Sequence, residues 1–137
     1  MAFAFPSSQA PTLRSILRIV AGLMFLLHGS QKMLGFPDPG ARLQEHAPML
    51  LKAAGIIELV CGALLVLGLF TSIAAFLASG EMAVAYFKQH FPDGFWPTLN
   101  GGELAALYCF VFLYLAFAGP GPWSLDAMMG RRRPARR

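Results

Sequence analysis

Several ionisable residues interrupt stretches of the sequence that are otherwise apolar. His28 and Lys32 lie one helical turn apart in "HGSQKMLGF" (residues 28–36), and Glu58 and Glu81 each interrupt a long apolar run further along the chain. Residues four apart share one face of a helix, so a single face can offer an imidazole and an ammonium to carboxylates on other helices. Such groups together can hydrogen-bond a polar ligand and transfer protons.

The composition predicts an integral membrane protein. Of the 137 residues, 56% are apolar and only 13% are charged, and a soluble domain of this size could not bury so much apolar surface. Lipid offers no partners to backbone polar groups, so only helices or closed barrels cross a bilayer. The uncharged runs are far longer than the roughly ten residues of a barrel strand. We therefore expect an all-α, polytopic membrane protein.

Turn signals divide the chain into four expected spans. Residues 50–86 are almost wholly apolar, and one helix of this length would reach about 55 Å at 1.5 Å per residue. This exceeds a hydrocarbon core of about 30 Å, so the chain must fold back, and "GLFTS" (residues 68–72) is the best break. The glycines and prolines of "GFPDPG" end the first span, and "HFPDGFWP" is expected to lie at the membrane surface. The expected spans are about 12–35, 50–67, 71–89 and 100–118.

These spans form a predicted four-helix transmembrane domain over residues 12–129. A flexible tail, residues 1–11, is expected to precede it, and a disordered arginine-rich tail, residues 130–137, to follow it. The arginines of "RRRPARR" are expected to set the membrane orientation or to bind anionic lipid rather than nucleic acid. Because more basic residues fall on the side of both ends than on the opposite side, we expect cytoplasmic termini.

This topology places the polar residues of the spans at two depths. The first layer lies about 10 to 14 Å below the outer face, counted at 1.5 Å per residue, and contains His28, Glu58 and Glu81. The second layer is shallower and contains Lys32, Asn100 and Glu103. A carboxylate facing lipid costs at least about 2.5 to 3.5 kcal/mol. We therefore expect the glutamates to face the interior of the bundle.

Other interpretations of the same residues remain open. The charges could pair only to hold the bundle together, although packed apolar residues often serve this purpose equally well. A metal site of His28, Glu58 and Glu81 is chemically possible, but a single histidine gives it little support and we expect none. Gly62 and Gly80 are interpreted as small residues that let helices approach closely.

Four stretches of the sequence resemble the DoxX family of small bacterial membrane proteins. They are "RIVAGLMFLLHGSQKMLGF", "GIIELVCGALLVLGLFT", "NGGELAALYCF" and "GPWSLDAMM". The resemblance covers nearly everything from Arg14 to Met129. It implies a four-helix protein of the bacterial cytoplasmic (inner) membrane, linked to quinone or thiol redox systems. The positions that match the family pattern are His28, Gly29, Gln31, Lys32, Gly55, Glu58, Asn100, Glu103 and Asp126.

The sequence contains no thiol pair, haem motif or flavin fingerprint, so the expected redox cofactor is a diffusible quinone. We expect an oxidoreductase, or a membrane subunit of one, that acts with membrane lipids and with a partner redox protein or a second copy of the chain. Two alternatives are an accessory protein that docks through the loop Pro37–Pro48 and a small proton-coupled transporter. The expected quinone-binding residues are His28, Gln31, Lys32 and Asn100, and the expected proton-transfer residues are Glu58, Glu81 and Glu103.

Overall fold

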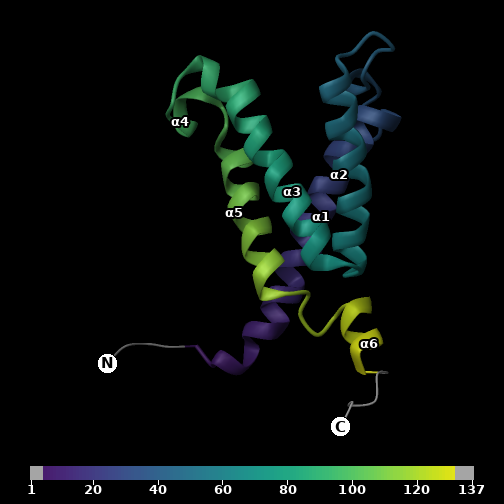
Figure 1. Cartoon of the computed structure of the whole chain (residues 1–137), viewed down its shortest axis with the longest axis vertical. Helices are drawn as coiled ribbons and strands as arrows, with labels where there is room; N and C mark the ends of the chain where they lie inside the picture. Colours follow the sequence, from purple (N-terminus) through teal and green to yellow (C-terminus); the bar gives the residue numbers. More distant parts are fainter. Residues whose placement is uncertain (1–4, 132–137) are drawn as a thin grey trace.

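Two antiparallel helix pairs lie side by side in the computed structural model (Figure 1). The first pair is α1 (Ala10–Leu34) with α2 (Met49–Leu67), and the second is α3 (Thr71–Ala85) with α5 (Glu103–Ala118). The structure describes residues 5–131, and within this range it contains helices and no strands. The predicted all-helical fold is therefore confirmed.

The connections between the long helices begin where glycine and proline predicted them. Gly35 and Gly68 end α1 and α2 in left-handed conformations, with φ of 71° and 68°, which glycine adopts without a steric penalty. The α1–α2 connection contains the turn η2 (Pro39–Ala41). At the predicted break in "GLFTS", the chain reverses within three residues and α3 begins at Thr71.

The chain remains helical beyond α3 through a π-helical turn, η3 (Tyr86–His90). The turn η4 (Phe91–Asp93) and the short helix α4 (Pro97–Asn100) then lead into α5. The start of α1 lies at the same end of the structure as the C-terminal helix α6 (Leu125–Arg131), as Figure 1 shows. We call this the α6 end, and the opposite end, which carries the α1–α2 connection and α4, the loop end.

Both predicted tails lie partly outside the described residues. Residues 1–4 of the expected N-terminal tail are not described, and the turn η1 (Ser7–Gln9) leads directly into α1. Residues 132–137 of the expected C-terminal tail are likewise not described, while Gly130 and Arg131 belong to α6. Helix α6 was not predicted from the sequence.

Helices α1 and α2 pack closely because glycines on each helix face the backbone of the other helix. A Cβ atom on Gly62 would lie only 2.6 Å from the Cα of Leu26, and one on Gly29 only 2.9 Å from the carbonyl carbon of Glu58. The interpretation of Gly62 as a close-packing residue is confirmed. The same interpretation of Gly80 is wrong, because a Cβ atom there would meet nothing within 4 Å.

The α6 end is held together by a buried arginine. Arg18 of α1 is fully buried, and its guanidinium donates hydrogen bonds to the carbonyls of Leu65, Val66, Pro120 and Trp123. The Val66 and Pro120 contacts measure 3.0 and 2.8 Å. Arg18 is one of the basic residues on the side of both ends from which cytoplasmic termini are expected. In the structure it joins the start of α1 to the end of α2 and to the segment after α5.

Helix α6 contributes a second tie at the same end. The carboxylate of Asp126 accepts hydrogen bonds from the backbone N–H groups of Phe70 and Thr71, both at 2.9 Å. These donors stand at the start of α3, where backbone N–H groups lack partners within the helix. Asp126 therefore caps α3, which explains structurally why α6 lies beneath the α2–α3 turn.

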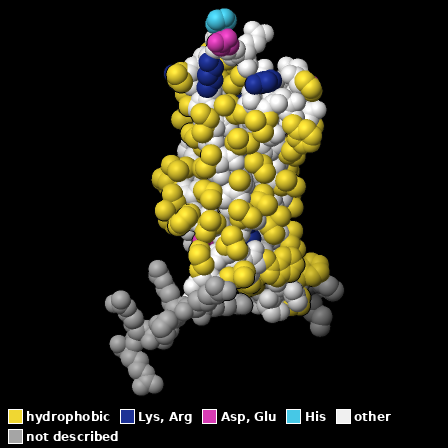
Figure 2. All heavy atoms as spheres, turned by 90° about the vertical axis from the view of Figure 1, so that its right-hand side faces the viewer, with side chains coloured by type: hydrophobic (Ala, Val, Ile, Leu, Met, Phe, Trp, Pro, Cys, Tyr) yellow, Lys and Arg dark blue, Asp and Glu magenta, His cyan; other side chains and the backbone are white. Residues whose placement is uncertain are grey.

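An apolar belt surrounds the helices. Figure 2 shows hydrophobic side chains over most of one face, with most of its charged side chains gathered at the loop end. The segments Ser7–Leu34 and Met49–Leu67 are long and apolar enough to cross a membrane, and Glu103–Ala118 is a shorter apolar helix. The exposed belt includes Val20, Leu23, Val60, Ile73, Phe76, Leu107, Phe110 and Phe117.

Candidate functional site

An ion pair joins α1 to α2 in the half of the structure nearer the loop end. Lys32 Nζ lies 2.7 Å from Glu58 Oε1, and Glu58 is only 2% exposed. Side chains on a helix point back toward its N-terminus. The long lysine side chain therefore brings its ammonium from a shallower position on α1 to the depth of Glu58, which merges the two predicted layers at this point.

Gly55 allows this pair to form. It lies three residues before Glu58 on the face of α2 that contacts α1, and a Cβ atom there would lie 3.3 Å from Lys32 Cβ and 2.9 Å from Met33 Sδ. A larger residue would push α1 away from α2. The close helix approach and the charged contact are thus parts of one arrangement.

A cavity of about 300 Å³ lies beside the ion pair, bordered by α1, α2, α3, η3 and α5. We call it the central cavity. Glu58 Oε2 and the hydroxyl of Tyr108 are buried here and have no hydrogen-bond partner among the described residues. The rings of His28 and Tyr108 are perpendicular, with centroids 6.3 Å apart. The polar and aromatic residues around this cavity are Phe25, His28, Lys32, Glu58, Gln89, His90 and Tyr108.

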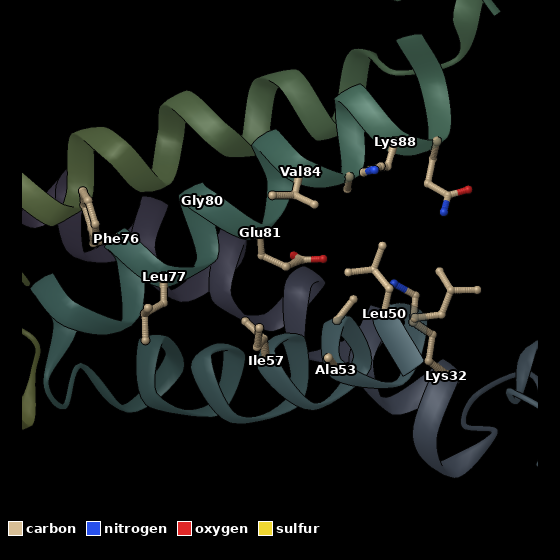
Figure 3. Close-up of a pocket in the computed structure, with 14 residues that line it drawn as sticks. Lys32, Leu50, Ala53, Ile57, Phe76, Leu77, Gly80, Glu81, Val84 and Lys88 are labelled. Atoms are coloured by element: carbon tan, nitrogen blue, oxygen red, sulfur yellow. The ribbon is translucent and has the colours of Figure 1, made fainter. Parts of the chain in front are cut away.

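A larger cavity of about 460 Å³ lies between α2 and α3, and we call it the lateral cavity. Figure 3 shows the carboxyl group of Glu81 extending from α3 into this space, which Lys32 also borders. Glu81 Oε2 is buried without a hydrogen-bond partner among the described residues. The rest of the wall is largely apolar, and its members Leu50, Phe76, Leu77 and Val84 are among the exposed large hydrophobic residues.

The two cavities share part of their walls. Lys32, Ala85 and Gln89 line both of them. Lys32 thus lies at the junction, while its partner Glu58 lines the central cavity and Glu81 lines the lateral cavity. Gln89 is presented by the π-helical turn η3, a distortion that is frequent at functional sites.

The structure brings together four of the predicted site residues and places the other three elsewhere. His28, Lys32, Glu58 and Glu81 surround the two adjoining cavities. Gln31 is half-buried on α1 and lines neither cavity. Asn100 and Glu103 precede or begin α5, and they do not join Lys32 in the expected shallow layer.

Asn100 uses its side chain to fold the loop end. Its amide nitrogen donates to the Tyr86 hydroxyl at 3.2 Å and to the Gly94 carbonyl at 2.7 Å. Its amide oxygen accepts from the backbone N–H of Gly102 at 2.8 Å. Gly102 immediately precedes α5, so Asn100 fixes the entry of the chain into this helix.

Glu103 lies on a different face of α5 from the central cavity. It is exposed in the first turn of the helix and borders a surface groove with Trp96 and Leu107. A carboxylate at a helix N-terminus is stabilised by the helix dipole. Gly101 and Gly102 separate α4 from α5, and the chain changes direction between these two helices. The predicted depth of Glu103 assumed one continuous helix over residues 100–118 and did not include this change.

Tyr108 was missed by the sequence analysis. It belongs to the strongly apolar α5, where a tyrosine is easily interpreted as an aromatic core residue. Its position five residues after Glu103 turns it to the opposite side of the helix, toward His28. The feature of the sequence that could have identified Tyr108 is its polar hydroxyl group within an otherwise apolar span.

Taken together, the site contains an ammonium, an imidazole, two carboxyl groups and a phenol around adjoining polar and apolar spaces. Such a set can hydrogen-bond the oxygens of a ligand and can donate or accept protons. The apolar wall can hold a hydrocarbon part of the same ligand. This combination is suited to an amphipathic molecule with a small polar headgroup.

Comparison with known proteins identifies the family to which this helical protein belongs. The family model described as DoxX matches residues 13–91, from α1 to the start of η4. The chain belongs to the DoxX family and is a membrane protein. The matched region includes the ion pair and Glu81, whereas Tyr108 lies outside it.

Three relatives extend over most of the chain. A Haemophilus influenzae protein titled "Uncharacterized protein" is 50% identical, covering 85% of this chain and 90% of its own length. An uncharacterized membrane protein of Mycobacterium tuberculosis is 29% identical over 93% of this chain and 88% of its own. Inner membrane protein YphA of Escherichia coli is 31% identical over 85% of this chain and 89% of its own. No solved structure matches the chain.

Proposed function

We propose that the protein crosses the bacterial inner membrane four times, with both termini in the cytoplasm. Support comes from the apolar belt and from the position of α1's start and α6 at one end (Figure 1). The helical segment from Thr71 through His90 is continuous, and at 1.5 Å per residue it reaches about 30 Å, the thickness of a hydrocarbon core. An inner membrane location also agrees with the name of the Escherichia coli relative, inner membrane protein YphA.

The function that the site supports best is quinone-linked oxidoreduction, by this protein alone or as a membrane subunit. The observation that carries this proposal is the Lys32–Glu58 ion pair at the junction of a polar cavity and an apolar one. A quinone has a flat headgroup with two carbonyl oxygens and an apolar tail. When bound, it would accept two electrons and two protons, and the electrons would come from a partner redox protein.

The residues present fit such a group. The cavity volumes of about 300 and 460 Å³ fall within the range of small-molecule sites. Lys32 Nζ and His28 supply hydrogen-bond donors for carbonyl oxygens. Glu58 Oε2 and Glu81 Oε2 are buried without partners among the described residues, so both are available to hold and release protons.

Quinone binding to the purified protein tests this proposal. We expect saturable binding of a prenylated benzoquinone to the protein in detergent, and loss of that binding in Glu58→Gln, which keeps the shape but not the negative charge. Glu45→Gln is the matched control, because Glu45 is exposed on the α1–α2 connection and should leave binding unchanged. The absence of binding to the unmodified protein would refute the proposal.

The loop end supports a second candidate, an accessory role in a membrane complex. The connection between α1 and α2 exposes Arg42, Glu45 and His46, and Figure 2 shows charged side chains gathered at this end. Such a surface suits a polar partner domain. Co-purification of one fixed partner, lost when these three residues are replaced by serine, would favour this role.

A further inference from the structure

Tyr108 occupies a position that packing alone does not explain. It is 5% exposed, and its ring stacks on Phe112 with centroids 5.3 Å apart. Phenylalanine would preserve this stacking. Tyr108 lines the central cavity, however, and its buried hydroxyl has no hydrogen-bond partner among the described residues. A buried hydroxyl without a partner destabilises a fold.

The polar groups of the central cavity include hydrogen-bond donors and an acceptor. Tyr108 can donate a hydrogen bond through its hydroxyl, Lys32 can donate through its ammonium, and Glu58 Oε2 can accept one. The cavity of about 300 Å³ is small and bordered by aromatic rings, which suits a flat ring carrying carbonyl oxygens. These features favour a headgroup rather than a hydrocarbon chain.

The lateral cavity has the opposite character. Its wall is largely apolar, and the exposed side chains of Leu50, Leu77 and Val84 lie along it. These residues belong to the apolar belt, so the cavity adjoins the region expected to contain lipid. It is suited to a hydrocarbon tail that enters from the bilayer.

Resting on the proposed function, we propose that the two cavities divide one prenylated quinone between them. The headgroup occupies the central cavity, where Tyr108 donates a hydrogen bond to one carbonyl oxygen, and the tail lies in the lateral cavity beside Gly80. Tyr108 is thus a binding residue for the headgroup. Gly80 provides space for the tail, which agrees with the open space around its position.

Matched substitutions on α5 test the headgroup site. Tyr108→Phe removes one hydroxyl from the wall of the central cavity. Tyr114→Phe removes one hydroxyl from the surface of the same helix, where Tyr114 is 52% exposed. We expect Tyr108→Phe to weaken binding of a benzoquinone about three- to tenfold, with or without a prenyl tail, as for a lost hydrogen bond. Tyr114→Phe should bind as the unmodified protein does. Without quinone, Tyr108→Phe should be at least as heat-stable as the unmodified protein.

Substitutions at Gly80 test the tail site. Gly80→Leu fills the lateral cavity, whereas Gly80→Ala adds only a methyl group and controls for the change in helix propensity. We expect Gly80→Leu to weaken binding of the prenylated benzoquinone about tenfold, the equivalent of roughly two buried methylene groups. Binding of the same benzoquinone without its tail should be unchanged.

The outcomes separate this inference from the proposed function. If the unmodified protein binds neither benzoquinone, the proposed function itself fails. If it binds both while Tyr108→Phe binds equally well or is less heat-stable without quinone, the headgroup assignment is overturned and the proposed function stands. Equal weakening of both ligands by Gly80→Leu would overturn the tail assignment alone.

Discussion

Replacing Lys32 with methionine tests how far the central ion pair contributes to stability. Methionine preserves much of the apolar length of lysine but cannot compensate the charge of Glu58. Because Glu58 is only 2% exposed, the substitution leaves a buried carboxylate without its partner. Breaking a buried pair in this way costs about 3 to 5 kcal/mol. We therefore expect Lys32→Met to lower the free energy of unfolding by about 3 kcal/mol.

Replacing the other member of the pair, Glu58, should lower the free energy of unfolding by less. Glu58→Gln leaves the Lys32 side chain, which is 28% exposed, free to extend its ammonium toward the loop end. We expect a loss of about 1 kcal/mol, the usual worth of one hydrogen bond. In the double variant neither charge remains, so its loss should be smaller than the sum of the two single losses by about 2 kcal/mol.

The free energies of unfolding of all three variants can be measured by titration with dodecyl sulfate in mixed micelles, followed by circular dichroism. Lys88→Met is the control, because Lys88 is exposed and its loss should change stability by less than about 0.5 kcal/mol. The reasoning is refuted if Lys32→Met behaves like this control. It is also refuted if the losses of the two single variants simply add in the double variant.

Three further predictions concern helix packing and the α6 end. Gly29→Leu should prevent α1 from approaching α2, because even a Cβ atom would lie 2.9 Å from the carbonyl carbon of Glu58. Gel filtration should show little monodisperse protein, and a normal yield of monodisperse protein would contradict the described packing of α1 against α2. Arg18→Lys should lower the unfolding free energy by at least about 2 kcal/mol, because an ammonium cannot reach carbonyls on every side of the guanidinium; an unchanged dodecyl sulfate midpoint would argue against that role. Asp126→Ala should cost about 1 kcal/mol through the lost cap of α3 and increase hydrogen exchange at Phe70 and Thr71, whereas unchanged exchange would exclude capping.

The helices could be predicted from the sequence because their signals are local. Gly35 and Gly68 end helices through a backbone conformation that glycine favours, and the length of the 50–86 run required a reversal. The inward position of Glu58 also followed from a general constraint, since charges within apolar helices must find partners. The partner itself was not predicted, because Lys32 was placed in the shallower layer with Asn100 and Glu103, whereas its ammonium reaches Glu58. The class of fold and the core of the candidate site were therefore accessible from residue types and spacing.

Other features depend on contacts that spacing does not encode. Arg18 is satisfied by backbone carbonyls, which every residue possesses, so no sequence pattern identifies its partners. Glu103 lies outside the cavities because the chain changes direction at the two preceding glycines, and Asn100 is engaged in that bend. The direction in which Tyr108 points depends on the same change of path.

The hydrogen bonds of Arg18 also impose an order on biosynthesis. Arg18 enters the membrane with the first helix, but its acceptors at Leu65 and Val66 follow with the second, and those at Pro120 and Trp123 only after the last long helix. The guanidinium therefore cannot be fully satisfied while the ribosome is still translating α5. A nascent chain halted before Pro120 would lack two of the four carbonyl acceptors of this guanidinium, which distinguishes it physically from the finished protein.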